Sequence, residues 1–318
     1  MAREANRRDF AALLAAAGAA VALTPIVAFA DAPQPAPLST TDLDDDTAVD
    51  IAATANRQVT APIYIDGDGP FSFLVDTGAN TSCISVELAK QLELPAGPMV
   101  KVNTVAGVRP RASVLIDKLQ VGSRTHRRMR APVLPVSGLV TDGLLGVDWL
   151  KGQRLVLGFS KGRMEITRSR TETAKDGQVI VPARRKSGQL TIVDADLSGE
   201  RISAIVDSGS EVSLGNEALR ALVRRKDRGS TVGARVNLIS VAGEKFYGEG
   251  GFLPFIRLGG LHLGNVPVVY ADTHVFRLWD LHKSPALILG MDVLRQFETV
   301  ALDFGRSAVR FDVSEAPA

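Results

Sequence analysis

The chain has 318 residues, an apolar content of 45% and a formal net charge of +2. This length leaves room for two domains of modest size with a sizeable core, and the small net charge gives no global indication of a nucleic-acid or membrane-surface partner. Because Cys83 is the only cysteine, an intrachain disulfide is excluded, although an exported protein is not. The apolar content and the 29 glycines suit a turn-rich β protein.

The first thirty residues are typical of a targeting segment. Arg7-Arg8-Asp9-Phe10 is a twin-arginine pair followed by a phenylalanine, an uncharged apolar run comes next, and Ala28-Phe29-Ala30 is a small-x-small cleavage site. We therefore expect residues 1–30 to be a twin-arginine-type signal peptide and the mature protein to be periplasmic. The apolar run is nearly long enough to span a bilayer, so an uncleaved N-terminal membrane anchor is the alternative.

Residues 31–55 combine prolines and acids with few large apolar side chains. Such a segment cannot bury enough apolar surface to order itself, which predicts a disordered linker or pro-segment. The acidic run at 42–46 lacks the spaced glycine and distal glutamate of a calcium loop. A solvated tail is therefore the better interpretation.

The next elements form a first repeat, from about residue 56 to residue 170. Alternating β-formers at 61–65 and 71–75, separated by Asp-Gly-Asp-Gly, predict a hairpin. Helix-like apolar spacing follows at 85–94, and alternation over 102–121 predicts strands. The closing strands are expected at 155–159 and 164–166.

A second repeat, from 171 to 318, retraces this order. Strands are expected at 190–193 and 201–206 with a turn at 198–199, then a short helix at 216–224. Further strands lie around the glycines of 243–260, and the closing strands are expected at 300–304 and 309–311. A period of about 130 to 145 positions is too long for a solenoid and indicates two related lobes. The boundary is expected in the polar stretch 168–178.

Each repeat has an acid at the end of an apolar run. The first is Phe73-Leu74-Val75-Asp76-Thr77-Gly78 and the second is Ala204-Ile205-Val206-Asp207-Ser208-Gly209. Because burying an ionised carboxylate costs several kcal/mol unless it finds partners, a strand that ends in this way is unusual, and two copies form a strong signal. Each acid is followed much later by an apolar-apolar-glycine tripeptide, Leu144-Leu145-Gly146 and Ile288-Leu289-Gly290.

With these motifs the sequence resembles the aspartic proteases, most closely the retropepsin-like branch, over nearly all of residues 56–313. The resemblance implies an all-β acid-protease fold with two homologous β-barrel-like lobes, a few short helices and an active site at the lobe junction. It also implies an aspartic endopeptidase, in which Asp76 and Asp207 share one proton and activate a water. Neither a cofactor nor a metal belongs to this mechanism.

The resemblance assigns roles to the neighbouring residues as well. Thr77 and Ser208 would cross-bond to the opposite loop, and Gly78 and Gly209 would allow the close approach. The two Val-Ala-Gly turns would be flap tips that close over an extended polypeptide substrate. The flap residues are Val105, Ala106, Gly107, Val241, Ala242 and Gly243, and the residues expected behind the acid loops are Leu145, Gly146, Leu289 and Gly290.

A further pair of recurrent acids, Asp148 and Asp292, follows the two apolar-apolar-glycine tripeptides. Their recurrence suggests catalysis, but their position just before short apolar segments favours helix N-caps, because a short helix needs its first amide groups satisfied.

Other groups of reactive residues are weaker. The four histidines, at positions 126, 262, 274 and 282, show no metal-ligand spacing, and Cys83 is best explained as a small buried apolar residue. The basic runs at 124–130, 184–186 and 224–228 have no interleaved aromatic residues, which favours solvated turns over a nucleic-acid site.

Two alternatives to a single-chain protease remain. The same duplicated fold could form a catalytically inactive periplasmic peptide- or protein-binding module, with Asp76 and Asp207 as structural loop acids. A homodimer that builds its site from two chains is unnecessary, because one chain carries both acid loops, so we expect a monomer.

Overall fold

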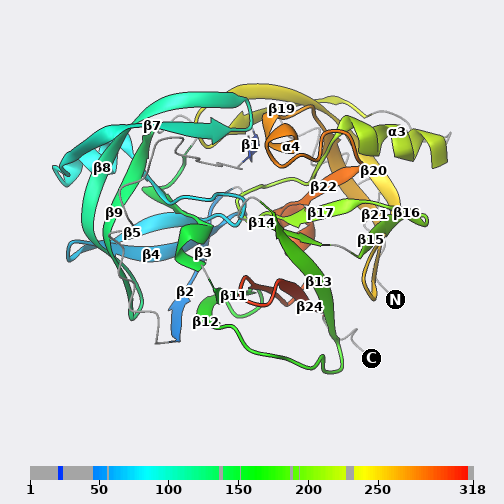
Figure 1. The fold of residues 1–318 in the computed structure, drawn as a ribbon, viewed down its shortest axis with the longest axis horizontal. Helices are drawn as coiled ribbons and strands as arrows, with labels where there is room; N and C mark the ends of the chain where they lie inside the picture. Colours follow the sequence, from blue (N-terminus) through cyan, green and yellow to red (C-terminus); the bar gives the residue numbers. More distant parts are fainter. Residues whose placement is uncertain are drawn as a thin grey trace.

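The computed structural model describes residues 21–23, 46–55, 57–135, 139–150, 152–186, 189–192, 194–226 and 233–313. Two β-rich lobes lie side by side above a shared sheet, with the first lobe at the left and the second at the right of Figure 1. The predicted all-β fold with two lobes and a few short helices is confirmed. The twin-arginine pair, the cleavage site and residues 31–45 lie outside the described residues. Within the described part of the chain, no helix is both long and apolar enough to cross a membrane.

The first lobe is built on an eight-stranded sheet with the order β3-β4-β5-β10-β6-β9-β8-β7. Its strands are β3 (Ala52–Ala53), β4 (Val59–Ile65), β5 (Asp68–Val75), β6 (Cys83–Ser85), β7 (Ala96–Thr104), β8 (Gly107–Val121), β9 (Arg124–Leu134) and β10 (Gly143–Leu145).

The predicted hairpin at the start of this lobe is present, with a tighter turn than expected. Ile65 pairs with Asp68, so the turn consists of Asp66 and Gly67 alone. Both residues have positive φ angles, 53° and 103°, as a two-residue hairpin turn requires. The hairpin thereby sets the register of β5, the strand that leads into Asp76.

The second lobe continues through β1-β19-β20-β21-β18-β22-β17-β14, with the β15–β16 hairpin attached to β20. These strands are β1 (Val21–Leu23), β14 (Gln189–Ile192), β15 (Ala195–Leu197), β16 (Glu200–Arg201), β17 (Ser203–Val206), β18 (Leu214–Gly215), β19 (Arg235–Ser240), β20 (Lys245–Leu258), β21 (Leu261–Tyr270) and β22 (Ala286–Leu289).

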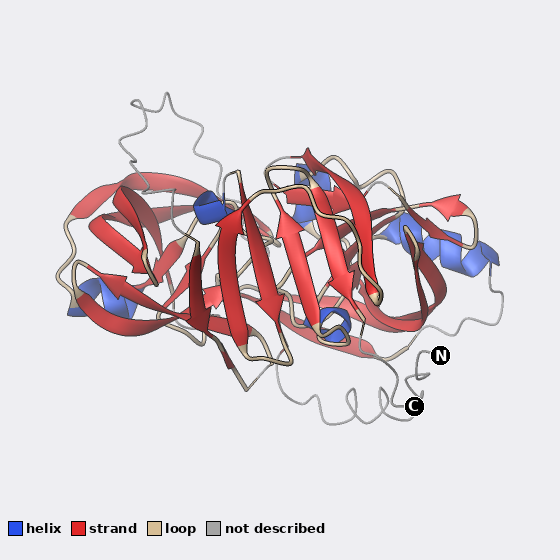
Figure 2. Cartoon of the chain, turned by 90° about the horizontal axis from the view of Figure 1, so that it is seen from below, coloured by secondary structure: helices blue, strands red, loops and turns tan. Residues whose placement is uncertain are grey.

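Six strands beneath the lobes join them, in the order β13-β24-β23-β11-β12-β2. Figure 2, from below, shows strands of this layer side by side. At its centre β11 of the first repeat pairs with β23 of the second, with Leu155 opposite Leu302. The strands are β2 (Thr47–Asp50), β11 (Gln153–Gly158), β12 (Arg163–Arg168), β13 (Gln178–Lys186), β23 (Thr299–Asp303) and β24 (Ala308–Asp312).

The prediction that residues 31–55 are a disordered linker is wrong for their last part. Thr47–Asp50 form the edge strand β2, which pairs with β12, and Ala52–Ala53 form β3, which pairs with β4. Thr47 is also buried, and its hydroxyl accepts from the amide of Ser123 at 2.9 Å. Cross-strand pairing therefore orders a segment whose composition alone predicted none.

Short helices occupy the predicted places, and one further helix, α4 (His274–Leu278), was not predicted. They are α2 (Val86–Gln91), the 3-10 helix η1 (Val147–Leu150), α3 (Glu217–Lys226), α4 (His274–Leu278) and α5 (Met291–Leu294). The helix expected at 85–94 is shorter, because Ser85 caps it by accepting from the amide of Leu88 at 3.0 Å and Leu92 ends it.

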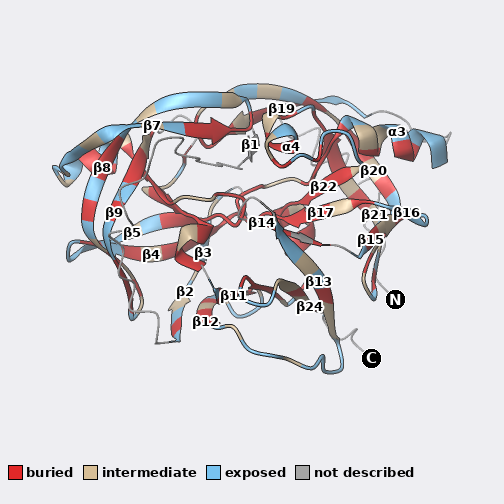
Figure 3. Ribbon diagram, viewed as in Figure 1, coloured by how far each residue is buried: buried red, intermediate tan, exposed pale blue. Residues whose placement is uncertain are grey.

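The largest core cluster runs from the first lobe through the six-stranded layer into the second. Alternate residues of its central strands, including Leu157, Val300 and Val309, are buried in this cluster. Figure 3 shows the buried strands converging where the two lobes meet. This shared core fixes the lobes relative to each other, and thus the two acid loops between them.

Candidate active site

Each acid follows a strand that pairs in parallel with the strand of an apolar-apolar-glycine tripeptide. β5 and β10 run parallel, with Val75 opposite Leu145, and the amide of Asp76 donates to the carbonyl of Leu145 at 3.0 Å. In the second lobe Val206 lies opposite Leu289, and the amide of Asp207 donates to the Leu289 carbonyl at 3.0 Å. The apolar-apolar-glycine tripeptides therefore lie next to the acid strands, as the resemblance implied.

The two acid loops are bound to each other by their hydroxyl residues. The amide of Thr77 donates to Ser208 Oγ at 3.1 Å, and the amide of Ser208 donates to Thr77 Oγ1 at 3.0 Å. Each hydroxyl in turn donates to a carbonyl across the junction, Thr77 to Val206 at 3.0 Å and Ser208 to Val75 at 2.8 Å. The four bonds form two matching pairs, one from each loop, and all four are buried.

Asp76 and Asp207 meet at the centre of this arrangement. Both are fully buried, and the carboxyl groups are close enough for the charge of Asp76 to act directly on Asp207. Asp76 Oδ1 accepts from the amide of Gly78 at 2.8 Å, and Asp207 Oδ1 accepts from that of Gly209 at 2.9 Å. A side chain on Gly78 would overlap the carboxyl group of Asp207, so only glycine allows the two acids this contact.

The environment of Asp207 favours its protonated form. Burial raises the pKa of Asp207 well above its ordinary value, the negative charge of Asp76 raises it further, and the amide of Gly209 opposes both effects. Two carboxyl groups in contact in a buried site cannot both ionise easily. The pair can therefore hold one proton at a pH at which isolated aspartates have lost theirs.

A second polar layer holds the loops from behind. Ser82 Oγ accepts from the amide of Gly146 at 3.0 Å and donates to Asp148 Oδ1 at 2.7 Å, while the Ser82 amide donates to Asp148 Oδ2 at 2.9 Å. A side chain on Gly146 would contact the backbone of Ala79 and Thr81 at 2.8–2.9 Å.

The second lobe repeats this layer closely. Ser213 Oγ accepts from the amide of Gly290 at 3.0 Å and donates to Asp292 Oδ1 at 2.7 Å. The prediction that Asp148 and Asp292 are N-caps is wrong, since Asp292 is inside α5, whose N-cap is Gly290, and Asp148 lies in the first turn of η1. Burial raises the pKa of both carboxyl groups, that of Asp292 to about 6.

Sequence reasoning missed two glutamines that reach across the junction. Gln58 Nε2 donates to the carbonyl of Gly209, and Gln189 Nε2 donates to the carbonyl of Gly78 at 3.0 Å and to Asn80 Oδ1 at 2.7 Å. Gln58 precedes Asp76 by 18 positions, and Gln189 precedes Asp207 by the same number. That equal spacing, like the six positions from each acid to Ser82 or Ser213, was a signal available in the sequence.

The two Val-Ala-Gly turns lie at hairpin tips, and each tip contacts the opposite lobe. Val105 is buried among second-lobe residues, and its carbonyl accepts from the amide of His274 at 2.8 Å. Val241 is buried among first-lobe residues. An ion pair between Arg109 and Glu244, with 3.4 Å between Nε and Oε1, links the two hairpins directly. Both tips are therefore in a closed arrangement.

Of the weaker candidates, His274 contacts the Val105 tip through its backbone amide, and Cys83 packs in the cluster that buries Val241. Cys83 is buried in the first lobe, as predicted, and burial raises the pKa of its thiol. Among the described residues, no group of three or more histidine, cysteine, aspartate or glutamate side chains is arranged to hold a metal ion. Exposed arginines 127, 128 and 130 of the first basic run lie on β9, whereas Arg124 is fully buried.

Comparison with known proteins agrees with this geometry. A sequence profile of the family described as "Aspartyl protease" matches residues 61–149 and 193–293. The two matched regions contain both acid loops, both Val-Ala-Gly turns and both apolar-apolar-glycine tripeptides. A search of curated proteins found no match. The profile covers more than half of the chain in two consecutive copies, and the chain therefore belongs to the aspartyl protease family.

Proposed function

We propose that the protein is an aspartic endopeptidase that hydrolyses peptide bonds with a water activated by Asp76 and Asp207. The observation that carries this proposal is that the cross-bonded Thr77 and Ser208 loops bring two fully buried carboxyl groups together, with the pKa of Asp207 raised. A general base and a general acid must stand together for this reaction. Membership of the family supports a polypeptide as the substrate.

The arrangement suits the following chemistry. Asp76, as the carboxylate, takes a proton from water while the water oxygen bonds to the peptide carbonyl carbon. Asp207, which holds the shared proton, donates it to the carbonyl oxygen, giving a neutral tetrahedral intermediate. Proton transfer to the peptide nitrogen then accompanies C–N cleavage, which leaves a carboxylic acid and an amine and returns one proton to the pair.

The position of the two hairpin tips favours a substrate that binds in an extended conformation. An extended chain adds backbone hydrogen bonds to the strands that cover it. Because both tips contact the opposite lobe in this arrangement, substrate entry requires at least one tip to lift. Loop motions of this kind commonly gate active sites.

Cleavage of an unfolded protein by Asp76→Asn and Asp207→Asn variants tests the proposal. Each variant should lose at least roughly a thousandfold in rate, as expected when one member of a concerted acid–base pair is removed. Asp117→Asn, an exposed acid on β8, is the control and should cleave like the wild type. Wild-type cleavage by either dyad variant would end the proposal.

The second candidate is an inactive peptide- or protein-binding module on the same fold. Binding of a statine-type transition-state analogue distinguishes the two, because an active dyad binds the analogue far more tightly than a substrate peptide. Equal affinity for analogue and peptide, without cleavage, would favour the binding module.

Localisation and oligomeric state complete the proposal. We propose export to the periplasm through the twin-arginine segment at residues 7–10, with a membrane-anchored form as the alternative. One chain supplies both acids, which supports a monomer. Mass spectrometry of the protein purified from the periplasm tests the export, and Asp31 is the expected first residue. The molecular mass in solution tests whether the protein is a monomer.

A further inference from the structure

A small cavity lies on the outer face of the six-stranded layer that joins the lobes. Its volume is about 110 Å³, and strands of both lobes and the segment between them line it. The inner face of the same strands is core, so this cavity is separate from the acid loops. Four of its lining residues are arginines: Arg154, Arg170, Arg306 and Arg310.

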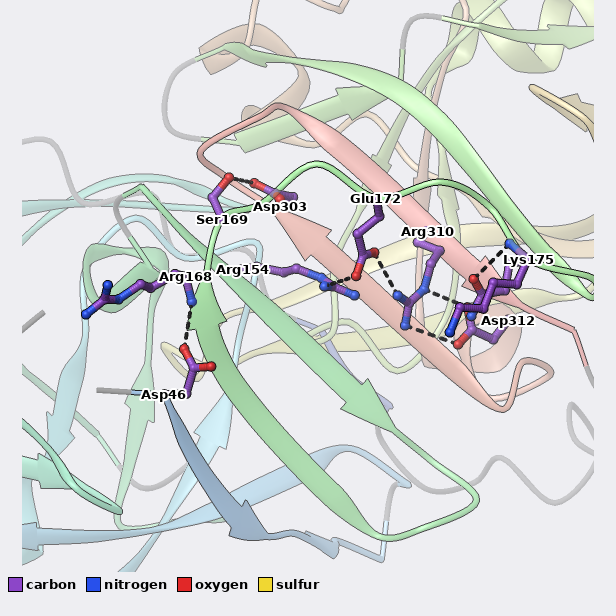
Figure 4. A network of polar contacts seen from close by, with 10 residues as sticks. Asp46, Arg154, Arg168, Ser169, Glu172, Lys175, Asp303, Arg310 and Asp312 are labelled. Carbon is purple, nitrogen blue, oxygen red and sulfur yellow. Dashed lines mark hydrogen bonds and ion pairs between the residues drawn. The ribbon is translucent and has the colours of Figure 1, made fainter. Parts of the chain in front are cut away.

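The two inner arginines are held in place by a chain of carboxylates, which Figure 4 shows. Glu172, from the segment between the lobes, accepts from Arg154 of β11 and, at 2.8 Å, from Arg310 of β24. Asp312 holds the other edge of Arg310 through bonds of 2.8 and 3.2 Å. The guanidinium groups therefore have fixed positions, and little side-chain entropy remains to be lost when a ligand binds.

Arg154 has hydrogen-bond donors that no described residue uses. Among the described residues, Arg154 donates to Glu172 alone and only through Nη1, although a guanidinium carries five N–H groups. The side chain is only 5% exposed. Its other nitrogens are nevertheless not among the fully buried polar atoms that lack a hydrogen-bond partner in the described residues, so solvent or a ligand can reach them. Since Arg154 lines the cavity, these donors face the cavity space.

The cavity lining has more positive than negative groups, with four arginines against Glu172 and Asp303. Glu172 is shared by two arginines, and Asp303 Oδ1 already accepts from Ser169 Oγ and from the amides of Gly305 and Arg306 at 2.6–3.0 Å. The side chains of Arg170 and Arg306 form no ion pair with a described residue, and both residues are exposed at the rim.

We propose that this cavity is a binding site for a small oxyanion of phosphate size. The bound anion would contact β11 of the first lobe, β24 of the second lobe and the segment between them. Arginine forks suit phosphate-like groups, because they donate paired hydrogen bonds with a fixed geometry. A water takes about 30 Å³ of liquid, so the cavity has room for one such anion. The site is independent of the proposed proteolysis, because it lies behind the layer and uses none of the acid-loop residues.

Inorganic phosphate is the probe, with chloride at equal ionic strength to separate binding from general screening. Phosphate should raise the melting temperature of the full chain beyond the effect of chloride, because a ligand that binds only the folded state stabilises it. Isothermal titration should give one site per chain. Equal melting temperatures in phosphate and chloride, with no heat of binding, would overturn the proposal.

A rim variant, Arg170→Gln with Arg306→Gln, removes two exposed charges and leaves the Arg154–Glu172–Arg310 chain intact. The matched control is Arg127→Gln with Arg128→Gln, since both of these arginines are exposed on β9. We expect the rim variant to bind phosphate at least about tenfold more weakly, with the control unchanged. An equal loss of phosphate affinity in both variants would show that only the net charge matters and would contradict a specific site in this cavity.

Arg154→Lys tests the inner donors. Lysine keeps the positive charge beside Glu172 but lacks the fork, so phosphate affinity should again fall by about tenfold. Acetate forms the last comparison, and it should bind more weakly than phosphate because it offers fewer oxygens and less charge. If acetate binds as tightly as phosphate, the proposed match to a phosphate-sized oxyanion is wrong.

Discussion

Thr77 and Ser208 exchange backbone-to-hydroxyl hydrogen bonds of 3.1 and 3.0 Å across the lobe junction. Each hydroxyl also donates to a carbonyl of the strand that carries the opposite acid. These contacts make the relative position of Asp76 and Asp207 a property of both lobes together.

Removal of the Ser208 hydroxyl should therefore damage both stability and activity. Ser208→Ala leaves the buried amide of Thr77 without its acceptor, which costs about 1–3 kcal/mol, and displacement of the acids should lower the cleavage rate by roughly 10²-fold. Ser208→Thr restores the hydroxyl found at position 77 and should retain activity. Denaturant unfolding and initial rates measure both effects, and an Ala variant that matches the wild type in both would contradict the proposed support.

The contact between Gly78 and the Asp207 carboxyl group gives a second prediction. A methyl group at position 78 would overlap that carboxyl group, so Gly78→Ala should separate the acids and reduce cleavage by roughly 10²-fold or more. Gly264→Ala is the control, because its added methyl would meet only the Pro254 carbonyl at 3.9 Å. Similar rates for the two variants would show that the close approach at Gly78 is unimportant.

Asp292 gives a prediction for the pH dependence of stability. Its pKa is raised from 3.8 to about 6, mainly by burial. Because the folded state binds the Asp292 proton more tightly than the unfolded state, protonation of Asp292 stabilises the fold. This contribution to the unfolding free energy is fully present below about pH 4 and is lost as the pH rises through about 6. At 1.36 kcal/mol per pKa unit the loss amounts to about 3 kcal/mol.

The Asp292→Asn variant isolates that contribution. The two oxygens of Asp292 accept separately from the hydroxyl and the amide of Ser213. Asparagine has a single side-chain oxygen, so the variant loses one of these bonds and is less stable at every pH. It should nevertheless lack the additional decline of the wild type between pH 4 and 6. Urea unfolding at several pH values measures the difference in unfolding free energy between the two proteins. A difference that stays constant across this range would contradict the shifted pKa.

The buried tips of the two hairpins predict an effect on substrate binding. Val105→Ser and Val241→Ser each place a hydroxyl in an apolar cluster of the opposite lobe, which should weaken closure by about 1–3 kcal/mol. The expected result is a raised KM and faster amide hydrogen exchange at the tips. Val108→Ser is the control, because Val108 is 44% exposed, and equal exchange rates in all three variants would count against tip docking.

Much of the fold could be predicted because the sequence repeats. Two acid loops, two apolar-apolar-glycine tripeptides and two Val-Ala-Gly turns in the same order indicate two similar lobes, and local alternation located most strands. β2 was missed, because an edge strand that pairs with a distant partner needs little apolar character of its own. Thr47–Asp50 are ordered by β12, more than a hundred positions away.

The candidate site was predictable in its residues but less so in its contacts. Asp148 and Asp292 have the residue type of an N-cap, yet each binds a serine that precedes it by 66 or 79 positions. Gln58 and Gln189 were missed because a glutamine at or just before the start of a strand has no local signature, and only a comparison of the two repeats reveals their equal spacing. Long-range hydrogen bonds of this kind follow from the way the lobes meet, which no window along the chain contains.

The central claim is that Asp76 and Asp207 share one proton across the lobe junction. It is tested most directly by NMR titration of ¹³C-labelled aspartate carboxyl groups, with the Asp207 signal assigned by its loss in Asp207→Asn. We predict that Asp207 titrates well above the ordinary aspartate range and that Asp76→Asn lowers its pKa, because the negative charge of Asp76 is removed. A midpoint for Asp207 near 3.8, or one that Asp76→Asn leaves unchanged, would contradict the shared proton.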